Sequence, residues 1–221
     1  PPRLSETVRM GVRSWWEEQA LPRLVDVALA DATAGTWRTS VCGGATGDVL
    51  EIGFASGRNL PYYPASVTSV LAVEPADLAW HRATARVTAS RMPVTRVGLD
   101  GADLPVADAS VDTVVSTWTL CTVPEVGRAL TEARRVLRPG GQLRFVEHSL
   151  ASHGRVAGLQ RRVQPVWGVF SGGCHVDRDI AGLLRDAGYA LDLTHDGFVQ
   201  GGVAKPWSWF VTGTATPKPR D

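Results

Sequence analysis

The chain has 221 residues, of which 44% are hydrophobic and 20% are charged, and its formal net charge is +1. This length fits one domain with a sizeable core, and the near-neutral charge gives no electrostatic reason to expect nucleic acid or an anionic membrane as a partner. No apolar run approaches the ~20 residues of a membrane span, and the first residues lack a signal-peptide pattern. We therefore expect a cytoplasmic protein without a membrane anchor that acts on a small molecule.

The three cysteines stand at positions 42, 121 and 174. They are an odd number and form no CxxC pair, which argues against a disulfide framework and against a structural zinc site. We expect a reducing cytoplasm and no metal, with Cys174 serving packing rather than nucleophilic chemistry.

The order of elements is typical of an α/β protein. Residues 4–29 have helical spacing, and the Gly-, Thr- and Ala-rich segment 31–47 is expected to be a connector. Short apolar runs then alternate with helical stretches, which predicts a parallel sheet covered by helices on both faces. The predicted strands are 48–53, 69–75, 94–99, 111–117 and 142–148, and the predicted helices are about 76–90, 124–137 and 177–187.

Two more strands are expected at residues 189–195 and 208–215, joined by a Gly-rich bend. The bend is too short for a helical crossover, so the two runs should form an antiparallel hairpin at the sheet edge.

A loop of small residues follows the first strand, between Glu51 and Asn59, and is expected to open a helix. Ligands of open α/β sheets bind at the carboxyl ends of strands, where a loop with few side chains lets backbone amides approach them. Arg58 occupies the place of the third glycine of the G-x-G-x-x-G fingerprint, so a dinucleotide is disfavoured. Glu51 would repel phosphates but attract a cationic amino group. The loop favours a positively charged cofactor without phosphates.

Two further strand ends carry acidic residues. Glu74 lies some twenty residues beyond the loop and could accept hydrogen bonds from both ribose hydroxyls, the alternative being an exposed carboxylate without a ligand. Asp100 could accept from an adenine amino group, while a neighbouring backbone N–H faces a ring nitrogen. Three strand ends would then converge on one adenosine.

These segments resemble class I S-adenosylmethionine-dependent methyltransferases. The resemblance rests on EIGFASG (51–57), VEP (73–75), DGADLPVADASVD (100–112) and RVLRPGG (135–141). Further segments across nearly the whole chain resemble the branch that includes the thiol S-methyltransferases, namely WWEEQALPRLVDVAL (15–29), GRNLPYYP (57–64), VVSTWTLCTVPE (114–125), RFVEHS (144–149) and GGCHVDRDIAGLLRDAGY (172–189).

The resemblance implies a Rossmann-like three-layer sandwich with a mostly parallel seven-stranded sheet and an antiparallel C-terminal edge hairpin. Residues 1–47 would be a helical extension and connector, and residues 48–221 the S-adenosylmethionine-binding domain, within one domain overall. Two departures are Ala55, where most relatives have glycine, and Gly101-Ala102, where Ala-Glu is usual. The implied cofactor-binding residues are Glu51, Gly53, Ala55, Gly57, Asn59, Glu74, Pro75, Asp100, Gly101, Thr117 and Trp118.

The leading functional hypothesis is methyl transfer from S-adenosylmethionine to a small molecule, with S-adenosylhomocysteine as product. A thiol is one candidate acceptor, and O-, N- or C-methylation are alternatives. A non-catalytic S-adenosylmethionine-binding protein is a second hypothesis, and a nicotinamide dehydrogenase a third that the glycine spacing disfavours.

The candidate catalytic residues are His148 and His175, each of which could take a proton from a thiol acceptor. The alternatives are a backbone-bonded His148 and a His175 that caps the following helix. Asp177 is expected to be the N-cap of that helix.

Overall fold

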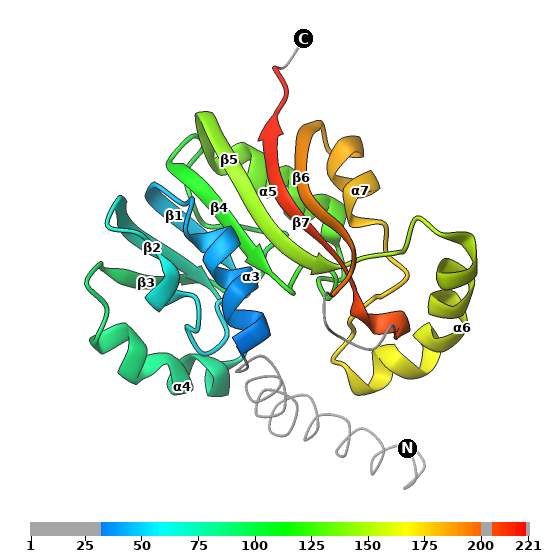
Figure 1. Ribbon diagram of the computed structural model, residues 1–221. Helices are drawn as coiled ribbons and strands as arrows, with labels where there is room; N and C mark the ends of the chain where they lie inside the picture. The colour runs from blue at the N-terminus through cyan, green and yellow to red at the C-terminus, as the bar shows by residue number, and fades with distance from the viewer. Residues whose placement is uncertain (1–31, 200–204, 220–221) are drawn as a thin grey trace, which may run out of the picture.

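The computed structural model describes residues 32–199 and 205–219. In this part of the chain one sheet has the strand order β3-β2-β1-β4-β5-β7-β6 (Figure 1). The strands are β1 (Gly47–Ile52), β2 (Val67–Val73), β3 (Val94–Gly98), β4 (Val111–Thr117), β5 (Leu137–His148), β6 (Tyr189–Phe198) and β7 (Trp209–Pro217). β7 pairs antiparallel with both β5 and β6, which confirms the predicted hairpin and the Rossmann-like fold class.

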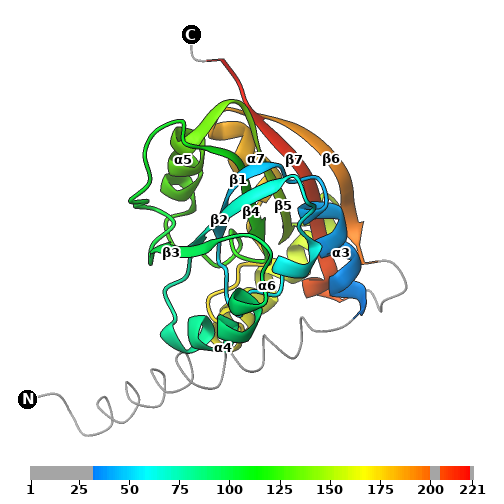
Figure 2. The same cartoon turned by 90° about the vertical axis from the view of Figure 1, so that its left-hand side faces the viewer.

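Helices cover both faces of this sheet. Figure 2 shows α5 and α7 on one side of the strands and α3 on the other. The α-helices are α3 (Ala32–Cys42), α4 (Asp77–Thr88), α5 (Val126–Val136), α6 (Gly154–Phe170) and α7 (Ile180–Asp186), and 3₁₀ turns occupy Leu60–Tyr62 and Pro206–Ser208. No helix among the described residues is long and apolar enough to cross a membrane.

Alternate residues of the central strands enter two separate cores. In β4, Val114 packs into the core that contains Leu130 of α5, whereas the next residue, Val115, packs into the core that contains Val41 of α3. All three valine side chains are buried, because successive side chains of a strand point to opposite faces. This explains why the central strands are apolar throughout rather than alternating with polar residues.

The expectation of a connector over 31–47 is wrong, because residues 32–42 form helix α3. The Gly and Thr residues of this segment have low helix propensity, so the helix depends on tertiary contacts. Val41 and Cys42 are buried, and the Arg144 guanidinium of β5 donates to the backbone oxygens of Ser40 and Val41. These bonds satisfy carbonyls at the helix C-terminus that have no partner within the helix.

Two other expectations need adjustment. Asp179 rather than Asp177 is the N-cap of α7, because its carboxylate accepts a hydrogen bond of 2.8 Å from the backbone N–H of Gly182. The loop after β1 leads into the 3₁₀ turn Leu60–Tyr62 rather than into an α-helix. The helical prediction for residues 4–29 lies outside the described residues.

Leu130→Ala should lower the free energy of unfolding by about 2–5 kcal/mol, because it leaves a cavity under α5 where the leucine is 1% exposed. Urea denaturation followed by circular dichroism measures this change. Arg128 lies on the outer side of the same helix, where its ion pair with Glu125 is solvent-exposed. Arg128→Ala should leave the urea midpoint nearly unchanged, and equal losses for both variants would contradict the core assignment.

Candidate functional site

The loop that follows β1 contains three residues with left-handed backbone. The φ angles are 78° at Gly53, 49° at Ala55 and 73° at Gly57. A Cβ at Gly53 would collide with the side chain of Thr119, so only glycine fits there. Ala55 carries the left-handed cost of about 1 kcal/mol, and its N–H donates to the Glu74 carboxylate at 2.7 Å. The backbone of the loop therefore follows a path with three left-handed residues, which neither a helix nor an extended strand contains.

A buried network of polar side chains, centred on Glu51 and Asn59, holds this loop in place. The carboxylate oxygens of Glu51, which is 1% exposed, accept hydrogen bonds from Asn59 Nδ2 at 2.9 Å and from the Tyr63 hydroxyl at 2.7 Å. Asn59 also donates to Thr117 Oγ1 and accepts from Arg38 Nε. Burial raises the pKa of Glu51 to about 7, although its hydrogen bonds and Arg38 oppose that shift.

Glu74, at the end of β2, is 6% exposed, so its interpretation as an exposed carboxylate is wrong. One of its oxygens accepts from the Ala55 N–H and the other from the Ala76 N–H at 2.8 Å. Burial raises the pKa of Glu74, against these two backbone bonds. Glu74 thus ties the loop to the end of the neighbouring strand.

The predicted adenine segment follows β3. Asp100 is exposed, and its Oδ1 accepts a hydrogen bond of 2.8 Å from the Ala102 N–H. A Cβ at Gly101 would lie 3.0 Å from Ile52 Cγ2, so an alanine at this position would require the Ile52 side chain to shift. Pro75, which follows Glu74, is exposed. These residues border the same strand ends as the loop.

Trp118 directly follows β4 and has left-handed backbone, with φ at 53°. Its backbone N–H donates to the backbone oxygen of Val146. The Arg38 guanidinium lies 5.1 Å from the centre of the Trp118 ring. The indole Nε1 is buried and has no hydrogen-bond partner in the described part of the chain. Buried donors are nearly always paired, so this atom together with the strained loop fits a ligand rich in acceptors, such as S-adenosylmethionine.

Glu147, which the sequence did not single out, organises the turn after β4. Its buried carboxylate accepts from Ser116 Oγ at 2.7 Å and from the N–H groups of Thr119 and Cys121 at 3.0 and 3.1 Å. Burial raises the pKa of Glu147, while these bonds oppose the shift. A single buried acid thereby fixes the turn that carries both Trp118 and Cys121.

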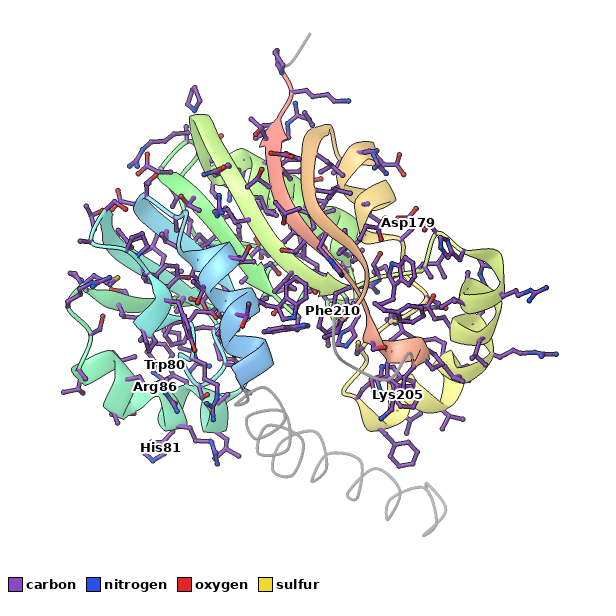
Figure 3. All side chains as sticks on the ribbon, in the orientation of Figure 1. Trp80, His81, Arg86, Asp179, Lys205 and Phe210 are labelled. Carbon is purple, nitrogen blue, oxygen red and sulfur yellow. The ribbon has the colours of Figure 1, made fainter. Side chains whose placement is uncertain are left out.

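The structure brings His148 together with two cysteines. His148 Nδ1 lies 3.7 Å from Cys121 Sγ and 3.5 Å from Cys174 Sγ, and the two sulfurs are 3.6 Å apart. The contact between the sulfurs lowers the pKa of Cys174 and raises that of Cys121. The His148 ring packs edge-on against Phe210, which is paired with it across β5 and β7. Figure 3 shows Phe210 between the α3 side and the α6 side of the molecule.

His175 is not part of this cluster. Its Nδ1 lies 3.4 Å from an Asp177 oxygen and 3.3 Å from Gln164 Nε2, and its side chain is 44% exposed. Its backbone N–H donates to the Cys121 oxygen, so its segment still braces the cluster. Of the two predicted catalytic histidines, only His148 therefore lies among the thiols.

Comparisons with known proteins agree with this fold and loop. Residues 50–145 match the family described as a methyltransferase domain. A SAM-dependent methyltransferase from Thermotoga maritima has a TM-score of 0.62 at 21% identity, with coverage of 96% of this chain and 97% of that chain, which supports the fold. Residues 50–145 therefore carry a methyltransferase domain, and the methyltransferase that shares its fold depends on S-adenosylmethionine.

Within this class, the chain is similar to two human thiol S-methyltransferases, as its motifs predicted. TMT1B is 35% identical over 153 residues, covering 66% of this chain and 62% of that protein. TMT1A is 32% identical over 166 residues, covering 73% of this chain and 65% of that protein. The chain thus spans somewhat less than two thirds of the length of these relatives.

The free energy of unfolding should become less pH-dependent in Glu51→Gln. The folded pKa of about 7 lies above the ordinary 4.5, so ionisation costs more in the folded state. The stability that a protonated Glu51 contributes is complete below pH 4.5 and is lost as the pH rises to about 7. Between pH 4.5 and about 7 the wild type should therefore lose about 3 kcal/mol more of its free energy of unfolding than the variant does. This value follows from about 1.4 kcal/mol for each unit by which the pKa is raised.

Urea unfolding of both proteins across this pH window measures the difference. Parallel pH profiles for the wild type and Glu51→Gln would contradict the assignment, since the other buried acids are the same in both proteins.

Proposed function

We propose that the chain transfers the methyl group of S-adenosylmethionine to the sulfur of a small-molecule thiol and releases S-adenosylhomocysteine. The observation that carries this proposal is the left-handed loop beside the Trp118 indole, whose Nε1 has no hydrogen-bond partner among the described residues, next to the sulfur-rich cluster around His148. The names of the human relatives support sulfur as the acceptor atom. A small neutral acceptor also agrees with the near-neutral net charge.

In this proposal the cofactor lies across the carboxyl ends of β1, β2, β3 and β4. The loop and the Glu51 network hold its methionine part, and Glu74 contacts the ribose through the lone pairs that the backbone amides leave free. The complete set is Glu51, Gly53, Ala55, Gly57 and Asn59 for the methionine part, Glu74 and Pro75 for the ribose, Asp100 and Gly101 for the adenine, and Thr117 and Trp118 for the floor.

The acceptor would approach from the side of β5 and β7. Methyl transfer is an in-line displacement at a carbon bound to positively charged sulfur, and the leaving group departs neutral and needs no acid. The protein therefore contributes mainly alignment and exclusion of water. A row of rings leads from the cofactor floor to the thiols, with Phe210 6.1 Å from Trp118 and 4.8 Å from His148 between ring centres. This row is the proposed wall of the acceptor site.

The catalytic roles of the two histidines belong to this proposal. His148 would contact the acceptor, since its ring lies at the end of the aromatic row. His175 would act at the rim, where its exposed ring beside Asp177 can exchange a proton with solvent.

The proposal also covers the domain boundary and the cellular compartment. We assign α3 to the same domain as the sheet, because Arg144 of β5 binds its last carbonyls. The three free cysteines fit a reducing cytoplasm. No nucleic-acid partner is needed.

Incubation of the protein with S-adenosylmethionine and a panel of thiols, phenols and amines tests the acceptor class by mass detection of methylated products. The expected result is a methyl thioether from at least one thiol, with no product from the matched alcohol of the same carbon skeleton. Methylated phenols or amines without any thioether would overturn the thiol assignment. Binding of the cofactor without any product would overturn the catalytic proposal.

Glu74→Gln should weaken S-adenosylhomocysteine binding by about 10–100-fold, because hydrogen bonds to a charged group are worth about 1.5–3 kcal/mol. Isothermal titration calorimetry measures the affinity. Asp77→Asn is the matched control, since that carboxylate lies three residues later with its side chain 91% exposed. Affinity that is unchanged in Glu74→Gln, or equally reduced in both variants, would refute the ribose contact.

A further inference from the structure

Cys121, His148 and Cys174 present three ligand atoms that converge on one point. All three atoms lie within 4.8 Å of one another, and the individual distances are 3.6 Å between the sulfurs and 3.7 and 3.5 Å from His148 Nδ1 to them. Both cysteines are buried and free, and His148 is half-buried. Thiolate sulfur and imidazole nitrogen are the ligands that zinc prefers in proteins.

These distances match one face of a zinc tetrahedron. With Zn–S bonds of about 2.3 Å and Zn–N bonds of about 2.0–2.1 Å, tetrahedral angles place two sulfurs about 3.8 Å apart and a sulfur and a nitrogen about 3.6 Å apart. Each observed distance between two ligand atoms agrees with its ideal value to within about 0.2 Å. The ligands would need almost no movement to bind the ion.

The fold holds each ligand from a different place in the sequence. Cys121 lies on the turn that Glu147 fixes, and His148 ends β5. Cys174 lies on the segment before α7, where its backbone oxygen accepts from Gln164 Nε2 of α6. These independent supports preorganise the three atoms, as metal sites require.

We propose that Cys121, His148 and Cys174 bind one zinc ion and leave its fourth coordination position for the acceptor thiol. Two cysteines, one histidine and an open position are a ligand set of catalytic rather than structural zinc sites. The location fits, because His148 stands at the end of the aromatic row that begins at Trp118 of the cofactor floor. This proposal departs from the expectation of no metal, which rested on the absence of CxxC pairs, a pattern of structural zinc sites.

The role of the ion in catalysis rests on the proposed function. The acceptor thiol would bind the zinc as a thiolate and lose its proton to solvent, because zinc stabilises the anion at neutral pH. A sulfur lone pair of this thiolate then forms the new bond to the methyl carbon. The bond from that carbon to the cofactor sulfur breaks, and its electron pair stays on that sulfur as the neutral S-adenosylhomocysteine. The thioether product is uncharged and a weaker ligand, so it leaves the ion.

Titration with Co²⁺ tests the metal site directly. The full chain is stripped with a chelator, kept reduced with a phosphine, and titrated with Co²⁺ without cofactor or acceptor. We expect a thiolate-to-cobalt charge-transfer band that saturates at one equivalent and disappears when Zn²⁺ is added. Cys174→Ser and His148→Ala should each weaken cobalt binding by more than about 100-fold, beyond the 10–100-fold typical of an outer-shell partner.

Cys42→Ala is the matched control, because Cys42 is a buried free cysteine on α3 outside the cluster. Its cobalt spectrum and affinity should equal those of the wild type. Circular dichroism without metal checks that each variant is folded, and His148→Ala alters a half-buried rather than a fully buried side chain. Lack of the band in reduced wild type, or an undiminished band in folded His148→Ala, would overturn the site.

The metal proposal and the proposed function can fail separately. A cobalt band without any thiol methylation would support the site and refute the activity. Thiol methylation at full rate in chelator-stripped protein would support the activity and refute the role of the ion in it.

Discussion

The buried carboxylate of Glu147 is the constraint on which both halves of the proposed site depend. It accepts hydrogen bonds from three donors, namely the Ser116 hydroxyl near the end of β4 and the N–H groups of Thr119 and Cys121 in the turn that follows. Burying a carboxylate costs free energy unless hydrogen bonds offset the loss of its hydration. In Glu147 the bonds that offset this cost hold the turn after β4 in place. That turn carries Trp118 and places Cys121 beside His148. In the proposed function, this one side chain would set the distance between the methyl donor and the acceptor.

Two other acids near the loop are likewise buried and held by hydrogen bonds. Glu51 and Glu74 are both buried, and burial raises the pKa of each. Their partners are the Asn59 and Tyr63 side chains for Glu51 and two backbone amides for Glu74. Three buried acids with raised pKa values at the carboxyl ends of β1, β2 and β5 are uncommon in a small domain, and they agree with a site that holds a positively charged ligand.

The sequence predicted what local patterns encode. The strands and the terminal hairpin follow from apolar periodicity and from the short Gly-rich bend, and the structure confirms them. Sequence patterns did not predict secondary structure that depends on tertiary contacts. An example is α3, a Gly- and Thr-rich segment whose C-terminal end is bound by Arg144. The Arg38 contact to Asn59, the Glu147 turn and the Cys121–Cys174 pair join residues more than twenty positions apart, and no spacing rule reveals such groupings.

A crystal structure with bound S-adenosylhomocysteine is the most direct measurement of the central claim, that one domain aligns a sulfonium methyl donor with a thiol acceptor. We expect the ribose on Glu74 and the cofactor sulfur above Trp118, directed along the ring of Phe210 toward Cys121, His148 and Cys174. A cofactor sulfur that points away from these three residues, or a ligand bound elsewhere on the sheet, would contradict it.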